Sequence, residues 1–235
     1  MPDKLEKGEG SLRVSLESVI GLALLVFSIV LHEVAHAFAA FKLGDPTAAR
    51  AGRLSLNPLV HIDPVMTIIL PAICYFMSGG TFIFGGAKPV PVNVYNFRNL
   101  RRDSAICAAA GPAANIFIAA ALLLLLCIKP LAPYDSLNWK VFLSVAAGNW
   151  VLAMFNLLPI PPLDGSKILM GIAPWKVARL FDMPFFGGLI LVILFVNFLW
   201  DMVYPFAMWP LFQAILLVEK VRAFFPGGPD IPGVF

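Results

Sequence analysis

Two histidines flank a glutamate near the start of the chain, in the sequence His32-Glu33-Val34-Ala35-His36. Residues four apart lie on one face of a helix, so both imidazoles can bind the same metal ion. The glutamate between them is placed to act as a general base toward a metal-activated water. A motif this short also arises by chance, and two helix histidines packed against polar neighbours are the structural alternative.

The surroundings of this motif favour a metal site. The apolar run from about Val14 to Leu43 is long enough to cross a bilayer. Histidine and glutamate inside such a run are costly, and residues of this kind there usually serve a function. His32 precedes Lys42 by about 15 Å of helix, at roughly 1.5 Å per residue. The predicted metal site therefore lies below the membrane surface.

A catalytic zinc needs a third protein ligand and one open position for water. The remaining candidates in or beside apolar segments are His61, Asp164 and Asp201. Asp164 ends the sequence NLLPIPPLD, whose three prolines force a non-helical backbone. At membrane depth such backbone is tolerated only where it is buried in protein or lines a cavity. An aspartate at this position can turn inward toward the metal.

The segments HEVAH and NLLPIPPLDG together resemble the site-2 protease family of intramembrane metalloproteases. The stretches FGGAKPVPVN and AAAGPAANIF are similar to its minimal members, which lack PDZ and CBS domains, and the resemblance covers roughly residues 25–170. It implies that His32, His36 and Asp164 bind one zinc ion per chain and that Glu33 is catalytic. It also implies that the substrates are membrane-embedded segments of partner proteins.

Several further polar residues are candidates for the site. Asn115 lies in an apolar segment, where its amide needs a partner, and it can donate a hydrogen bond to the oxyanion of the reaction. It also resembles an asparagine that family members place near the site, whereas Gly111 is explained by close helix packing. Asn156 fits helix packing better than catalysis, and His61 fits an interfacial loop better than a substrate or auxiliary metal contact. Asp201 fits a membrane-interface cluster with its aromatic neighbours.

The composition predicts an all-α polytopic membrane protein with about five to six apolar helices. Sixty per cent of the residues are hydrophobic and 13% are charged, against about 25% charged in soluble domains. One membrane domain over residues 1–235 is expected, with a catalytic core at about 14–170 and C-terminal helices at about 185–224. The net charge of +3 gives no reason to expect nucleic acid. The cysteines lie in apolar runs without paired spacing, which is typical of packing residues.

The metal hypothesis also constrains the topology. Long apolar helices are expected at 104–128 and 140–158, and the second delivers Asp164. If residues 64–77 crossed the membrane, His32 and Asp164 would lie on opposite sides. Residues 64–102 are therefore predicted to form a re-entrant or β-like element, in which FIFGGAKPVPVN could pair with an unwound substrate.

The distribution of basic residues predicts the orientation. The loop opposite the metal site contains only Lys129 and Lys140. By the positive-inside rule the metal site faces the cytoplasm, in a multi-pass protein of a prokaryotic plasma membrane. The basic residues on the side of the metal site are Lys42, Arg50, Arg53, Lys88, Arg98, Arg101 and Arg102.

The alternatives for a membrane zinc protein are a metal transporter, a catalytically inactive relative and a different class of metalloprotease. A metal transporter needs a polar path across the bilayer, and intramembrane acids and histidines are otherwise scarce. A catalytically inactive relative is disfavoured because all four catalytic positions are present. A metalloprotease with glutamate as the third ligand lacks a candidate, since Glu219 lies near the C-terminal end. The expected partners are membrane protein substrates and the lipid bilayer.

Overall fold

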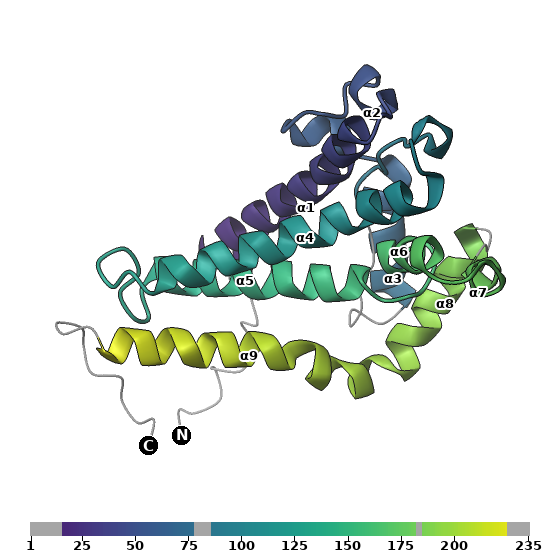
Figure 1. The fold of residues 1–235 in the computed structure, drawn as a ribbon. Coiled ribbons are helices and arrows are strands. Elements are labelled where there is room, and N and C mark those ends of the chain that lie inside the picture. Colours follow the sequence, from purple (N-terminus) through teal and green to yellow (C-terminus); the bar gives the residue numbers. More distant parts are fainter. Residues whose placement is uncertain (1–15, 78–85, 182–184, 225–235) are drawn as a thin grey trace, which may run out of the picture.

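The computed structural model describes residues 16–77, 86–181 and 185–224, and within these ranges the regular structure is helical with no strand. The all-helical prediction is therefore confirmed for the described chain (Figure 1). The long helices are α1 (Leu16–Lys42), α4 (Leu100–Leu126), α5 (Leu137–Asn156), α8 (Phe185–Phe198) and α9 (Trp200–Phe224). The shorter helices are α2 (Thr47–Arg50), α3 (Leu70–Met77), α6 (Asp164–Ile172) and α7 (Trp175–Ala178).

Within the described residues, three helices are long and apolar enough to cross a membrane. They are Val19–Lys42, Leu100–Leu126 and Trp200–Phe224. Large apolar side chains such as Leu22, Phe117 and Phe206 are exposed on these helices. Exposed apolar surface on this scale requires a partner, and a lipid bilayer supplies it. The chain is therefore a membrane protein.

Helices α1, α4 and α5 pack side by side (Figure 1). Helix α5 is parallel to α1, since Gly21 faces Ser144 and Ser28 accepts a hydrogen bond from Asn149 further along both helices. Helix α4 comes between α1 and α5 in the sequence and runs antiparallel to both. The C-terminal ends of α1 and α5 therefore lie at the same end of the molecule, which is what the predicted topology requires.

Helix α9 runs antiparallel to α5. The indole of Trp150 donates to the carbonyl of Ala207 at 2.8 Å, near the start of α9. Near its end, Arg222 is buried, stacks 4.7 Å over the ring of Trp139 and donates to the carbonyl of Leu126. These contacts hold α9 against the bundle at both ends.

The C-terminal helices divide differently from the prediction. The sequence predicts apolar segments at 185–204 and 207–221, with an interruption at Pro210. Instead α8 ends at Phe198, and α9 continues through Pro205 and Pro210. Prolines are tolerated inside membrane helices where neighbouring groups satisfy the freed carbonyls. A local sequence pattern contains no information on those neighbours.

The β-like element predicted within 64–102 is wrong for its described part. Residues 64–69 form a π-helical turn that leads into α3, and residues 86–93 have no regular secondary structure. Pro89 and Pro91 lack the amide hydrogens that a strand ladder needs. The amides beside them bind elsewhere: Lys88 donates to the carbonyl of His61, and Val90 donates to the carboxylate of Glu33. Residues 78–85 lie outside the described residues.

The buried carboxylate of Asp45 joins the end of α1 to the segment that precedes α4. It accepts hydrogen bonds from the amide of Asn93 and the side chain of Asn96, each at 2.7 Å. It also accepts from the hydroxyl of Thr47 and from the amide of Thr47, the latter at 3.1 Å. Burial alone raises the pKa of Asp45, but these hydrogen bonds outweigh burial and lower the pKa below its ordinary value.

Replacing Asp45 with asparagine is expected to destabilise the fold by about 1–3 kcal/mol at neutral pH, because an amide cannot accept all of these hydrogen bonds. The ionised carboxylate stabilises the fold above the unfolded-state pKa, and this contribution is lost as the pH falls through the folded-state pKa. Thermal unfolding in detergent at several pH values should therefore show a difference from wild type that shrinks in acid. The exposed Asp135→Asn variant is the control. A difference that is independent of pH would contradict this role.

Candidate metal centre

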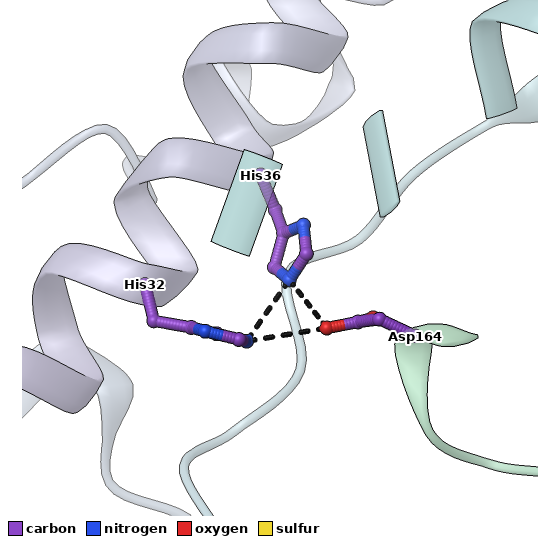
Figure 2. A group of neighbouring side chains, drawn as sticks. All are labelled: His32, His36 and Asp164. Atoms are coloured by element: carbon purple, nitrogen blue, oxygen red, sulfur yellow. Dashed lines mark hydrogen bonds and ion pairs between the residues drawn. The ribbon is translucent and has the colours of Figure 1, made fainter. Parts of the chain in front are cut away.

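The structure brings His32, His36 and Asp164 together, although Asp164 is 128 residues from His36 in the chain. The two imidazoles extend from one face of α1, and the carboxylate reaches them from the first residue of α6 (Figure 2). The two Nε2 atoms lie 3.1 Å apart. Oδ2 of Asp164 lies 3.1 Å from Nε2 of His36 and 3.3 Å from Nε2 of His32. All three side chains are buried.

This triangle of donor atoms fits zinc. Tetrahedral zinc with nitrogen and oxygen ligands at about 2.0–2.1 Å holds neighbouring donors about 3.3 Å apart. The three measured separations, 3.1, 3.1 and 3.3 Å, match that spacing. Two imidazoles and one carboxylate are also a donor set that zinc accepts in catalytic sites. The described residues can therefore hold a zinc ion.

Helix α4 orients the imidazole of His36 through a hydrogen bond at Nδ1, whereas Nε2 faces the other donor atoms. Nδ1 of His36 lies 2.8 Å from the carbonyl oxygen of Cys107, which only accepts, so Nδ1 carries the hydrogen and donates it. In the neutral ring this leaves the lone pair on Nε2, which faces the carboxylate of Asp164. Convergent lone pairs repel each other unless a cation lies among them. The contact with Cys107 thus favours metal binding by fixing the tautomer of the ligand.

Gly111 provides the space for both imidazoles. A Cβ atom at this position would lie 2.4 Å from Nε2 of His36 and 2.6 Å from Nε2 of His32. A real Cβ never approaches other atoms so closely. Sequence reasoning explained Gly111 by helix packing alone and did not connect it with the metal site. Its register, one turn before Asn115 on the same face of α4, is the signal that could have done so.

The turn after α5 positions Asp164. Helix α6 begins directly after the proline-rich turn, and Gly165 packs so closely that a Cβ there would lie 2.2 Å from the carbonyl oxygen of Leu157. The second carboxylate oxygen of Asp164, Oδ1, lies 3.3 Å from Nζ of Lys167. One oxygen therefore faces the histidines and the other faces a lysine. Lys167 is not among the site residues predicted from the sequence.

Glu33 lies beside this triangle but is not part of it. Its Oε2 accepts a hydrogen bond from the amide of Val90 at 3.2 Å. Glu33 and the three candidate ligands line one large pocket of about 1410 Å³. Glu33 therefore shares the pocket of the three candidate ligands without being one of the converging donors.

The other candidate residues fall into two groups. Asn115, Asn156 and Asp201 line the same pocket, and the buried Oδ1 of Asn115 has no hydrogen-bond partner among the described residues. Asn156 donates from its side chain to the carbonyl of Leu152 within α5. His61 does not line this pocket; it is buried, and its Nε2 donates to the carbonyl of Ser55 at 2.8 Å. The structure thus places His61 in loop packing.

The helices and the donor set define the class of protein, which is a membrane protein with a candidate zinc centre. Sequence similarity to known proteins then identifies the family within this class. "Putative zinc metalloprotease YwhC" of Bacillus subtilis is 36% identical over 197 residues, which cover 81% of this chain and 84% of that protein. "Putative zinc metalloprotease Rip2" of Mycolicibacterium smegmatis is 33% identical over 186 residues, which cover 77% of this chain and 70% of that protein. "Putative zinc metalloprotease MJ0611" of Methanocaldococcus jannaschii is 31% identical over 151 residues, which cover 64% of this chain and 69% of that protein.

The chain belongs to the site-2 protease family of zinc metalloproteases. Its cofactor is accordingly zinc, and its chemistry is proteolysis. No protein-family model matches the chain. No solved structure matches it.

Proposed function

We propose that this protein is an intramembrane zinc endopeptidase, which hydrolyses a peptide bond in or near a transmembrane segment of a substrate protein. The observation that carries the proposal is the donor triangle of His32, His36 and Asp164, with Glu33 beside it in one pocket. The histidines belong to a helix that is apolar and long enough to cross a membrane. Substrates that reach this site are therefore themselves membrane-embedded.

In the proposed reaction, His32, His36 and Asp164 hold one zinc ion. Zinc supplies Lewis acidity, which polarises the scissile carbonyl and lowers the pKa of a water molecule. Glu33 removes a proton from the attacking water and returns it to the leaving amine. The amide of Val90 donates to Oε2 of Glu33 and so orients this carboxylate in the pocket. The side-chain amide of Asn115 donates a hydrogen bond to the substrate carbonyl oxygen as that oxygen gains negative charge.

We infer that the chain is one multi-pass membrane domain with five to six apolar helices. Helix α5 has 20 residues, about 30 Å at 1.5 Å per residue, and packs against α1, α4 and α9. Its buried Asn149 faces a neighbouring helix, because the side chain donates a hydrogen bond to Ser28 of α1. The helical segments at 64–69 and 70–77 are too short to span and fit a re-entrant element. The basic residues near the end of α1 support an orientation with the site toward the cytoplasm of a prokaryotic plasma membrane.

A transmembrane substrate must lose helical structure before it is cleaved. Its carbonyl groups are otherwise engaged in helical hydrogen bonds and are shielded from attack. Residues 86–93, which have no regular secondary structure, supply Ala87, Val90 and Val92 to the lining of the pocket. An unwound substrate segment can lie along them. Substrates with glycine or proline in the membrane segment should therefore be cleaved faster.

The purified protein should be tested in liposomes with a substrate that crosses the membrane once. Cleavage is expected to stop when a chelator removes zinc and to resume when zinc is restored. Mass spectrometry of the products should place the cut in or near the transmembrane segment. Cleavage confined to soluble loops, or cleavage that survives chelation, would refute the proposal, as would zinc uptake into the vesicles without any cleavage.

A further inference from the structure

A second pocket lies where α1 ends and α4 begins, apart from the residues that line the large pocket. Its volume is about 220 Å³. Five of its six lining residues are polar, and the six come from the end of α1 and from the start of α4 with the two residues before it. The lining residues are Lys42, Leu43, Arg98, Asn99, Arg102 and Asp103.

Within the part of the chain that the structure describes, the three cations of this pocket have no anionic partner. Among the described residues, no carboxylate forms an ion pair with Lys42, Arg98 or Arg102. The pocket's own acid, Asp103, is buried, and its Oδ2 accepts the amide hydrogen of Asn99 at 2.8 Å. This hydrogen bond stabilises the N-terminus of α4, so the carboxylate of Asp103 is already engaged within the protein. The pocket therefore retains an excess of positive charge.

The start of α4 adds to this positive potential. Helix α4 has 27 residues, and Asn99 caps it by accepting a hydrogen bond from the amide of Arg102 at 3.1 Å. The first amides of a helix have no acceptor within it, and the helix dipole makes this end attractive to anions. A phosphate group is the ligand that such a helix start and clustered cations recognise together.

The position of the pocket identifies the source of the phosphate. Lys42 ends one candidate membrane span and Leu100 begins another, so the pocket lies at the level where spans leave the apolar layer. Phe38 and Phe41 are about half exposed on α1 just before the pocket, and Ile106 is exposed on α4. Nζ of Lys42 lies 5.3 Å from the centre of the Phe38 ring, so this apolar surface adjoins the pocket and offers a path for acyl chains. Free phosphate has no acyl chain and would make no contact with these apolar side chains.

We propose that this pocket binds the phosphate headgroup of an anionic phospholipid. Basic pockets between membrane helices on the cytoplasmic side are suited to such headgroups. The bound lipid bridges the end of α1 and the start of α4. Next to the pocket, Leu43 packs on the small cluster of Ala40, Phe97 and Cys107, and the carbonyl of Cys107 accepts the hydrogen bond from His36. The lipid therefore stabilises the pair of helices that frames the metal centre.

The full-length protein, freed of native lipid, should be tested with phosphatidylglycerol and with phosphatidylcholine of identical chains. Native mass spectrometry measures how much of each lipid the protein retains. The variant Lys42→Gln/Arg98→Gln/Arg102→Gln is expected to bind phosphatidylglycerol about 10- to 100-fold more weakly than wild type, given the usual contribution of each basic residue. The matched control, Arg50→Gln/Lys88→Gln/Lys176→Gln, removes the same charge from exposed positions outside the pocket and should bind like wild type.

Three outcomes would overturn the proposal. Equal weakening in both variants would show diffuse attraction rather than a site, and undiminished binding in the pocket variant would exclude the pocket. Inorganic phosphate that displaces the lipid and stabilises the protein equally well would show a free-anion site instead. If the triple variant fails to fold, the single variant Arg98→Gln serves, since the Arg98 side chain has no hydrogen bond within the described structure and its loss should weaken lipid binding alone.

Discussion

Replacing Glu33 with glutamine is expected to reduce proteolysis by about 100- to 10,000-fold, the usual contribution of a general base. Glutamine has nearly the same shape and can still accept the hydrogen bond from Val90. It has no basic carboxylate and cannot take the proton from water. Zinc should remain bound, because Glu33 is not one of the three converging donors. Cleavage rate and zinc content, measured on the same preparation, test both statements.

The matched control for this variant is Glu17→Gln, which makes the same chemical change on the same helix, away from the pocket. It should cleave like wild type. Undiminished proteolysis by Glu33→Gln would refute the mechanism. Loss of zinc in that variant would instead make Glu33 a ligand. An inactive variant that still holds zinc should also retain uncleaved substrates, which can be identified among the membrane proteins that co-purify with it.

Replacing Gly111 with alanine is expected to weaken zinc binding by about 100-fold or more, beyond the effect usual for residues that only orient ligands. The added Cβ would overlap Nε2 of both histidines, the atoms that are proposed to bind the metal. The clash cannot be relieved cheaply, because α1 and α4 pack along much of their length. Competition with a chromophoric chelator measures the affinity, and cleavage should fall in parallel.

A glycine-to-alanine change in α1, the helix that packs against Gly111, separates this clash from a general packing effect. In Gly21→Ala the new Cβ would lie 3.5 Å from Oγ of Ser144, an ordinary contact, so zinc affinity should not change. Alanine also favours helix over glycine by about 1 kcal/mol, so neither variant should unfold its helix. Full zinc affinity in Gly111→Ala would show that the donor triangle does not bind the metal.

Much of the architecture follows from local patterns in the sequence. Apolar runs with few charges predict the long helices, because only a helix satisfies its own backbone in lipid. The prolines at 159, 161 and 162 end α5 close to the predicted position. The spacing of His32 and His36 puts both on one helix face. Asp164, by contrast, stood among several candidate ligands on residue type alone, and the resemblance to a known family selected it.

The prediction missed features that depend on contacts between distant residues. Period and propensity describe a segment alone, whereas Gly111 matters because of its position against two imidazoles of α1. The segment 86–93 reads as a strand, but it lacks strand pairing because the amides of Lys88 and Val90 bind a loop carbonyl and Glu33.

The sequence by itself determined the long helices α1, α4 and α5, the two histidines and the intervening glutamate, since these depend on spacing within a single element. Only the tertiary structure decided how Asp164, Gly111 and the carbonyl of Cys107 converge on those histidines. The reason is physical. A candidate metal centre needs donors from separate helices at defined distances, and those distances are set by how α1, α4 and the turn after α5 pack.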